Sequence, residues 1–539
     1  MNNNFNSFYK LAIRVTEKLK LQLVIPLIIF CLLLGKDPFS DRSLIPNFEP
    51  FPDSFHYILP ARCLITQGVW KLCRPTTEGR DADVPPLYSI VLIPFFLIHN
   101  DPRMFFFANV VLATGSFVAL YLILSKLKIH PFIQLSILLI ASSRYHLYWF
   151  PSLAMAENLM LLLFLINILL LLSKALPTKI IGVLAAFGFY ATKFAYAPVM
   201  LVFVCFQLFS IWQKTKQASI WLLLFSVGIA VSGLALSLKL DSFITLFSPL
   251  FFKLTLTEAE QQKAWFSLAF VPSHLWQYVE ALLGKPTLIL WDVRPIFPWV
   301  LSLCGIVGLI WGVFQDRFRV LCLTIILSVA SQVIFISSFY AFDSRYILHS
   351  IYALLIGLSL AGTLLLDYFK KYQRHISIAI PFLIGLYLFS QITPLRHQLA
   401  VNYKYAESPW YYLATREIDK VVSEEDGEVI LVTALPAYFF DFFGTGSYTV
   451  LPVSKEQEKE QKYLVYGNQY NYENLPLLYE SLLKSGHKVY LSNYGLGNAA
   501  YMHEEYKLIT DRFNAILLTE GCHGACNVFK LELKASNDS

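Results

Sequence analysis

The stretch MFFFANVVLATGSFVALYLILS (residues 104–125) decides the class of fold. It contains no charged side chain, and as a helix it could cross a hydrocarbon core of about 30 Å. Similar apolar runs recur through the first three quarters of a chain of 539 residues that is 56% hydrophobic and 15% charged, with a mean hydropathy of +0.54. A soluble protein of this length would need more polar surface to cover its core. The composition therefore predicts a polytopic α-helical membrane protein.

The apolar runs predict about eleven transmembrane helices. We expect them at residues 19–35, 104–125, 131–149, 154–173, 180–192, 195–212, 218–237, 296–314, 320–338, 346–366 and 376–393. The run at 85–98 is shorter than a span should be, so we interpret it as a re-entrant or interfacial segment. It lies in a first outer loop at 37–103, and a second large outer loop is expected at 238–295.

The distribution of basic residues predicts the orientation of these spans. With a cytoplasmic amino terminus, the inner segments hold most of the basic residues, whereas the short outer turns and nearby span ends hold only three: Arg144, Lys193 and Arg345. This is the positive-inside pattern of membrane proteins, which also accounts for the net charge of +6 without nucleic-acid binding. The asymmetry predicts a multi-pass protein of the plasma (inner) membrane, with its carboxy-terminal part outside the cytoplasm.

The long apolar runs end near residue 393, which divides the chain into a membrane module at 1–393 and a soluble extracytoplasmic domain at 394–539. The pattern of this domain predicts an α/β fold. We expect helices at 408–422 and 475–485, strands at 428–433, 463–466, 488–492, 515–518 and 527–533, and a hairpin turn at 444–446.

Four cysteines occur as two close pairs in outer segments, Cys63 with Cys73 and Cys522 with Cys526. Close pairs on an oxidising face favour disulfide bonds. Metal binding is the alternative for the second pair, but its spacing is not that of a zinc site and no second pair stands nearby.

Ionisable residues at membrane depth are costly and usually functional. Asp53 follows the first span by about twenty residues, at the head of an amphipathic helix. Glu157 opens the fourth span at its outer end, where a solvated helix start is the simpler interpretation. Lys193 could be an isolated lysine that reaches toward water. Asp343 and Arg345 could form a local salt bridge, but an arginine here also suits the two parallel hydrogen bonds of a phosphate.

At this point the sequence resembles the GT-C glycosyltransferases, above all the protein O-mannosyltransferases and the aminoarabinose transferases. The landmarks that carry the resemblance follow the order of that family: Asp53-x-x-x-Tyr57, Ala61-Arg62, Gly68-x-Trp70, Pro85-Pro-Leu-Tyr88, Ala156-Glu-Asn-Leu159, Gly182 to Lys193, and Ser344-Arg-Tyr346. No single motif is specific, but their order and membrane depth agree with the family. The resemblance covers spans one to ten, and residues 443–452 are similar to a strand-turn-strand of many members.

The resemblance implies transfer of a hexosyl or pentosyl group from a polyprenyl-phosphate carrier to a protein, lipid or glycan hydroxyl in the cell envelope. Asp53 would be the general base, as suits a carboxylate near a reacting hydroxyl, and Glu157 would orient the acceptor or the sugar. Arg345 and Lys193 would bind the donor phosphate and stabilise its developing charge. Supporting positions are His56, Tyr57, Arg62, Asp343 and Tyr346.

The chain departs from the family at two of these positions. Asp53 is followed by Ser54, where many O-mannosyltransferases have a glutamate. This weakens the case for a divalent metal, which the sequence otherwise leaves open as a cofactor. Lys193 stands where the family often has arginine, so it lacks a bidentate grip on phosphate. The rival function is a lipid-linked saccharide transporter or flippase, which should instead line a path through the spans with charges.

Overall fold

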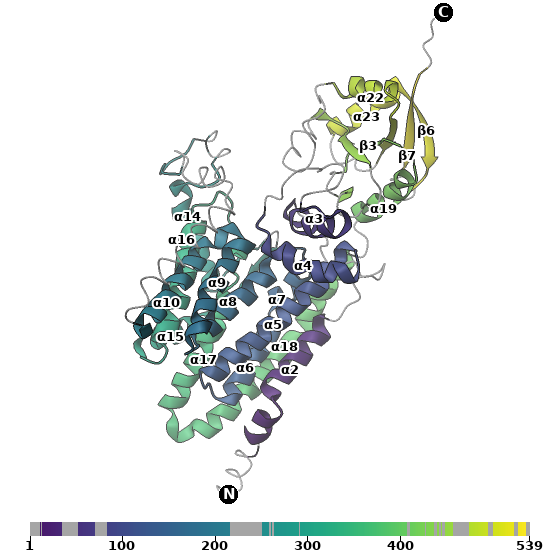
Figure 1. Cartoon of the computed structure of the whole chain (residues 1–539). Coiled ribbons are helices and arrows are strands. Elements are labelled where there is room, and N and C mark those ends of the chain that lie inside the picture. The colour runs from purple at the N-terminus through teal and green to yellow at the C-terminus, as the bar shows by residue number, and fades with distance from the viewer. Residues whose placement is uncertain are drawn as a thin grey trace, which may run out of the picture.

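The computed structural model describes residues 11, 13–34, 52–70, 84–215, 251–257, 260, 264–289, 292–406, 410–425, 427–435, 439–440, 444, 448–455, 474–493, 500–521 and 527–534. These residues form a bundle of long helices and a separate domain built around a β-sheet (Figure 1). The amino-terminal end of the described chain and the turn between the last two bundle helices lie at one end of the bundle. The sheet domain lies beyond the other end (Figure 1).

The helices of the bundle are apolar along most of their length. Their bounds are α2 (Leu21–Leu34), α5 (Phe105–Lys126), α6 (Pro131–Ser142), α8 (Glu157–Leu171), α9 (Leu176–Thr192), α10 (Ala197–Thr215), α15 (Trp299–Phe314), α16 (Arg319–Ser337), α17 (Ser350–Tyr368) and α18 (Gln373–Ala406). Four helical segments in the described part are long and apolar enough to cross a membrane: Pro102–Lys126, Phe194–Gln213, Arg319–Ser337 and Ser350–Tyr368. The chain is therefore built as a polytopic helical membrane protein. The predicted span at 218–237 lies outside the described residues.

The third predicted span is not one helix. Helix α6 ends at Ser142, and a short helix α7 (Tyr145–Trp149) follows after residues 143–144. The Tyr148 hydroxyl donates a hydrogen bond to the Ser142 carbonyl oxygen, which helps satisfy the backbone at the end of α6. The break places Arg144 between the two helices, and a 3-10 turn (Phe150–Ser152) then leads toward α8.

Two shorter helices lie across the end of the bundle that is nearer to the sheet domain, α3 (Pro52–Gln67) and α4 (Leu87–Ile98) (Figure 1). They pack against each other, and Arg62 Nε on α3 donates to Asn100 Oδ1 just beyond α4, at 3.0 Å. Helix α4 corresponds to the run at 85–98, and its 12 residues are fewer than a span requires.

The segment predicted as the second large outer loop, called the second outer segment below, contributes two elements to this end of the structure. Helix α14 (Val271–Leu282) packs against α16 and is followed by a two-stranded antiparallel hairpin, β1 (Pro286–Ile289) and β2 (Asp292–Pro295). The hairpin also contacts the 3-10 turn at Ser344–Ile347. These contacts bring the outer segment onto the end of the bundle where Arg345 lies.

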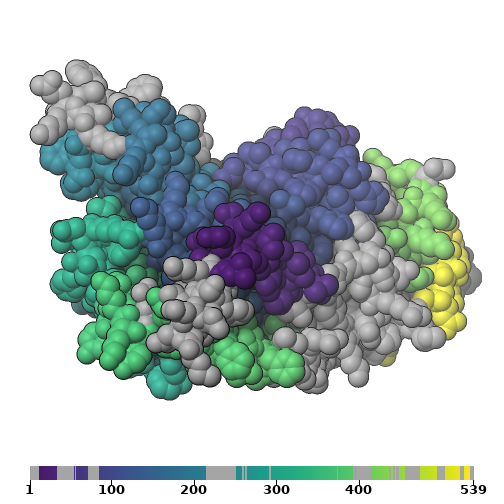
Figure 2. Space-filling view, turned by 90° about the horizontal axis from the view of Figure 1, so that it is seen from below, coloured from purple at the N-terminus to yellow at the C-terminus, as the bar shows by residue number. Residues whose placement is uncertain are grey.

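The sheet domain has five strands in the order β4-β3-β5-β7-β6. Its bounds are β3 (Val429–Thr433), β4 (Thr449–Pro452), β5 (Lys488–Ser492), β6 (Phe513–Thr519) and β7 (Val528–Leu533), with helices α19 (Trp410–Ser423), α22 (Leu475–Lys484) and α23 (Ala500–Arg512). Strand β3 pairs in parallel with β4 and β5, whereas β7 is antiparallel to both of its neighbours. Seen from the amino-terminal end of the bundle, part of this domain projects beyond the helices (Figure 2).

The elements found in this domain agree with most of the sequence predictions, including β5 at 488–492 and α22 at 475–484. Strand β4 pairs with β3, in parallel. Apart from Gly444, the predicted hairpin turn at 444–446 lies outside the described residues, as do the predicted strand at 463–466 and the helix start at 408–409.

Helices α15 and α17 approach each other closely along glycines. A Cβ atom on Gly308 would collide with the carbonyl oxygen of Gly357, and one on Gly357 would collide with that of Gly305. Small residues allow membrane helices to come this close, because lipid supplies little driving force for their association. The contact fixes α17, and the turn that carries Arg345 immediately precedes α17.

We expect Gly308→Ala to lower the free energy of unfolding by about 1–3 kcal/mol, because the added methyl group meets backbone atoms that cannot rotate away. Thermal unfolding of the detergent-solubilised protein measures this. Gly385→Ala in α18 is the matched control, since nothing lies within 4 Å of the added carbon. The control should leave stability unchanged or raise it, as alanine is the better helix former. Equal melting temperatures for the two variants would contradict the close packing.

Candidate functional site

Glu157 and Lys193 form a buried ion pair. Glu157 is the first residue of α8, and Lys193 directly follows the last residue of α9, so the pair joins two helix ends. Lys193 Nζ lies 2.5 Å from Glu157 Oε1, and the two side chains are 10% and 2% exposed. The structure therefore overturns the simpler interpretations of both residues, because Glu157 is not a solvated helix start and Lys193 is not an isolated lysine.

Arg345 pairs with Asp343 in the 3-10 turn before α17. Arg345 Nε lies 3.1 Å from Asp343 Oδ2, and the Arg345 backbone N–H donates to Asp343 Oδ1 at 2.8 Å. Arg345 Nη2 also donates to the Tyr346 hydroxyl at 3.0 Å. The local salt bridge considered from the sequence is thus present, and it fixes the direction of the guanidinium group.

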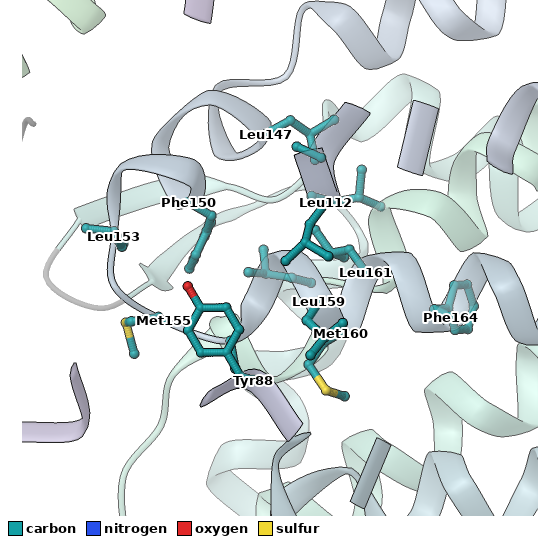
Figure 3. Packing of buried hydrophobic residues seen from close by; sticks show 14 of the residues in the cluster. Tyr88, Leu112, Leu147, Phe150, Leu153, Met155, Leu159, Met160, Leu161 and Phe164 are labelled. Atoms are coloured by element: carbon teal, nitrogen blue, oxygen red, sulfur yellow. The ribbon is translucent and has the colours of Figure 1, made fainter. Parts of the chain in front are cut away.

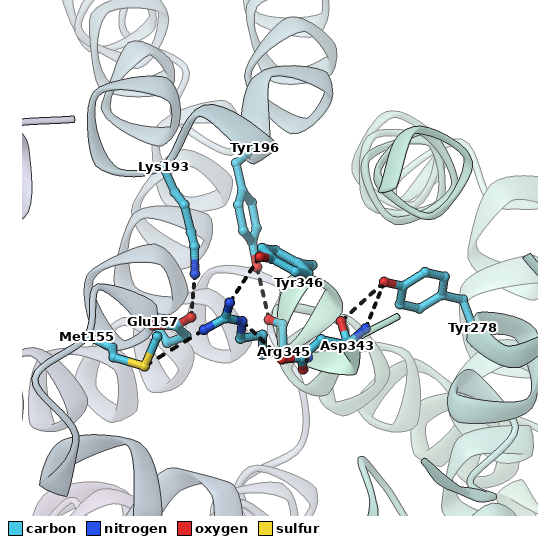
Figure 4. A network of polar contacts seen from close by, with 8 residues as sticks. All are labelled: Met155, Glu157, Lys193, Tyr196, Tyr278, Asp343, Arg345 and Tyr346. Carbon is cyan, nitrogen blue, oxygen red and sulfur yellow. Dashed lines mark hydrogen bonds and ion pairs between the residues drawn. The ribbon is translucent and has the colours of Figure 1, made fainter. Parts of the chain in front are cut away.

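The two ion pairs meet around one aromatic ring. Lys193 Nζ lies 5.0 Å and Arg345 Cζ 4.9 Å from the centre of the Tyr346 ring. Arg345 Nη1 reaches the sulfur of Met155 at 4.0 Å, two residues before Glu157 (Figure 4). Lys193 follows Glu157 by 36 residues and precedes Arg345 by 152, so local sequence does not bring these side chains together. The fold does so, because it places α8, α9 and the turn before α17 next to one another.

Elements of the second outer segment hold the turn that carries Arg345. The Tyr278 hydroxyl on α14 donates to the Asp343 carbonyl oxygen at 3.2 Å and accepts from the Asp343 backbone N–H at 3.4 Å. Burial raises the pKa of the Tyr278 hydroxyl above its usual value, so the hydroxyl keeps its proton and can donate. Thr287 Oγ1 on β1 lies 2.9 Å from Ser344 Oγ in the same turn. The outer segment is therefore in direct contact with the site.

A chain of buried contacts leads from α3 to the loop before Glu157. The Tyr57 ring packs edge-on against the Tyr88 ring, with 5.3 Å between centres, and the Tyr88 hydroxyl donates to Asn109 Oδ1 at 2.9 Å. Asn109 Nδ2 donates in turn to the Leu153 carbonyl oxygen at 2.8 Å. Tyr88 lies among the apolar residues of this loop (Figure 3). Helix α3 is thereby tied to the segment that positions Glu157.

Asp53 belongs to α3, whose first residue is Pro52. The position of Asp53 is one helical turn before Tyr57, on the helix that contacts α4. The side chain of Asp53 lies outside what the structure describes, so its predicted catalytic role stays a prediction. Of the supporting residues, His56 and Tyr57 are buried, and Arg62 contacts Asn100.

Of the four cysteines in the two predicted disulfide bonds, only Cys63 lies among the described residues. Cys63 on α3 is disulfide-bonded. Its predicted partner Cys73, and both members of the predicted pair Cys522–Cys526, lie outside the described residues. Across the part of the chain that the structure describes, no three His, Cys, Asp or Glu side chains gather where they could hold a metal ion.

Comparisons with known proteins identify the fold. No family model matches the chain, and no curated protein matches its sequence. Two solved structures of ArnT from Cupriavidus metallidurans match, one in the apo state and one bound to undecaprenyl phosphate. Each has a TM-score of 0.54 and covers 96% of this chain and 98% of ArnT, at 11% and 12% sequence identity. The chain has the fold of ArnT. ArnT is an aminoarabinose transferase of the GT-C class, so the resemblance seen in the sequence is confirmed for the fold.

Sequence reasoning missed several residues of this site. Tyr278 and Thr287 lie in a segment whose helix and hairpin were not predicted, and their contacts with the turn before α17 are long-range. Asn109 gave a usable signal, because it is a polar residue inside an apolar span. Tyr196 was also missed; its hydroxyl lies 3.5 Å from the Arg345 carbonyl oxygen (Figure 4).

We expect Lys193→Met to destabilise the protein by about 3–5 kcal/mol, because it leaves the buried Glu157 carboxylate without its cation. Glu157→Gln should have a similar effect through Lys193. The double variant, which removes both charges, should recover much of the lost stability. Thermal unfolding of the two single variants and the double variant completes this cycle. Additive losses in the double variant would show that the two side chains do not interact as an ion pair.

Proposed function

We propose that the protein is a membrane glycosyltransferase, which moves a sugar from a polyprenyl-phosphate carrier to an acceptor hydroxyl on the outer face of the membrane. The observation that carries the proposal is the placement of two cations, Lys193 and Arg345, over the single ring of Tyr346. The fold of ArnT supports it, because one ArnT structure is bound to undecaprenyl phosphate. The acceptor would be a protein, lipid or glycan.

Arg345 is suited to bind the phosphate of such a donor. Its Nη1 contacts the Met155 sulfur, which is a weak hydrogen-bond acceptor. A phosphate oxygen would be a much stronger partner, and the Asp343 carboxylate would keep the guanidinium group in place. In our proposal the phosphate replaces the sulfur at Nη1.

Lys193 would contribute a second positive charge to the same phosphate. Its ammonium group carries several donors on a flexible stem, so it can turn from Glu157 toward a phosphate without a large change in the backbone. Glu157 Oε2 is buried and has no hydrogen-bond partner among the described residues. Once Lys193 turns away, the Glu157 carboxylate would accept a hydrogen bond from the sugar or the acceptor.

Asp53 would act as the general base of the transfer. Its carboxylate takes the proton of the acceptor hydroxyl while the acceptor oxygen forms a bond to the anomeric carbon. The bond from that carbon to the phosphate oxygen breaks, and its electron pair leaves with polyprenyl phosphate. Arg345 and Lys193 would stabilise the charge that this phosphate gains.

The orientation of the protein follows from the same proposal. We place the sheet domain outside the cytoplasm and the amino terminus inside, in the plasma (inner) membrane. Lys370 and Lys371 support this, because they lie in the turn between α17 and α18, at the end of the bundle away from the sheet domain (Figure 1). Basic residues near span ends favour the cytoplasmic side.

Asp53→Asn should lower the rate of sugar transfer by about 10²-fold or more, while binding of the donor is retained, because the amide cannot accept the proton. Purified protein assayed with a panel of polyprenyl-phosphate sugars measures both quantities. Arg345→Ala is the complementary variant, and it should weaken donor binding. Wild-type transfer by Asp53→Asn would rule out its role as the base. Movement of the carrier across a bilayer without cleavage of the sugar–phosphate bond would identify a transporter instead.

Reporter fusions test the orientation. We expect a fusion after His99 to report an extracytoplasmic position and a fusion after Lys128 a cytoplasmic one, since α5 lies between them. A cytoplasmic enzyme reporter and a periplasmic one, used in parallel at each position, give opposite signals. Finding Lys128 on the outer side would contradict the orientation, and with it the proposed place of Asp53.

A further inference from the structure

Arg144 is a cation at the end of the bundle that the ion pairs of the site do not involve. It lies in the break between α6 and α7. Its Nη2 and Nε both donate to Ser143 Oγ, at 2.8 and 3.3 Å, and its guanidinium carbon lies 5.5 Å from the centre of the Phe297 ring. Tyr387 on α18 also lies beside it. These contacts hold the guanidinium group in one place.

Three other cations at this end of the molecule have a carboxylate partner. Arg103 pairs with Asp101 at 2.8 Å, Lys193 with Glu157 and Arg345 with Asp343. Arg144 has none among the residues that the structure describes, where its contacts are a neutral hydroxyl group and aromatic rings. A charge that is shielded from water without a counter-ion is costly, so a site of this kind favours an anion from outside the chain.

Arg144 lies where the apolar helices of the bundle meet the hairpin β1–β2. The hairpin β1–β2 of the second outer segment packs on α7, where the Pro295 carbonyl oxygen lies 3.3 Å from His146 Nε2 and Arg294 stacks over the Tyr145 ring at 4.0 Å. Apolar helices α6 and α18 continue from this level toward the other end of the bundle. A guanidinium group at such a boundary can meet the phosphate of a lipid whose chains lie against the helices.

We propose that Arg144 binds the phosphate of an anionic phospholipid, at a site separate from the one that holds Arg345. Ser143 accepts from Nε and from one N–H of Nη2, and Tyr387 makes a further hydrogen bond with the guanidinium group. The N–H groups that are left can form charge-assisted hydrogen bonds to phosphate oxygens. The net negative headgroup would neutralise Arg144, which a zwitterionic lipid does less well because it brings its own cation. The Phe297 ring would pack beside the glycerol region.

The test uses the full-length protein in bilayers of phosphatidylcholine with and without phosphatidylglycerol, with the retained lipids counted by native mass spectrometry. The wild type should retain phosphatidylglycerol in preference to phosphatidylcholine. Arg144→Gln should lower that retention by about tenfold or more, as expected for the loss of charge-assisted hydrogen bonds. Arg103→Gln is the control, because it removes a cation that already has a carboxylate partner, and it should retain phosphatidylglycerol as the wild type does.

Two further measurements test the proposal independently of Arg144→Gln retention. Arg144→Lys keeps the charge but loses the planar fork, so it should retain an intermediate amount of phosphatidylglycerol. Binding of undecaprenyl phosphate should be the same in Arg144→Gln and the wild type. No preference for phosphatidylglycerol in the wild type, or unchanged retention in Arg144→Gln, would overturn the proposal. Loss of undecaprenyl phosphate binding in Arg144→Gln would also overturn it, by assigning Arg144 to the donor site.

Discussion

The arrangement of the site depends on the ion pair between Glu157 and Lys193. Both charges are shielded from water, so each one would be costly alone, and their mutual attraction is strong at a distance of 2.5 Å. The pair joins the start of α8 to the end of α9, and it faces the turn that carries Arg345. Pairing thus lets the fold keep ionisable groups at a depth where they would otherwise be excluded.

The four ionisable side chains of this cluster have formal charges that cancel. Lys193 and Arg345 contribute two positive charges, and Glu157 and Asp343 contribute two negative ones. A neutral cluster can be buried at lower cost than a set of like charges. The proposed donor phosphate would add a negative charge, and it would bind best where a cation can change its partner. The flexible Lys193 fits that part better than Arg345, whose direction is fixed by Asp343 and Tyr346.

Much of the fold could be predicted from the sequence because a membrane span has a simple requirement, a long apolar run. Glu157, Lys193 and Arg345 could also be selected from the sequence, because they are charged residues at the ends of such runs. The partners of these residues could not be predicted. The contacts of Tyr278 with Asp343 and of Asn109 with Leu153 join segments far apart in the chain, and no local spacing encodes them.

The order of the strands in the sheet domain could not be predicted for a similar physical reason. Strand β4 pairs in parallel with β3 at the edge of the sheet. Parallel pairing is decided by which edge of the sheet is free and by the helices that cover its faces, and neither is visible in a short motif. The same limit applies to Arg144. That it has no carboxylate partner among the described residues became visible only when the residues around it were brought together.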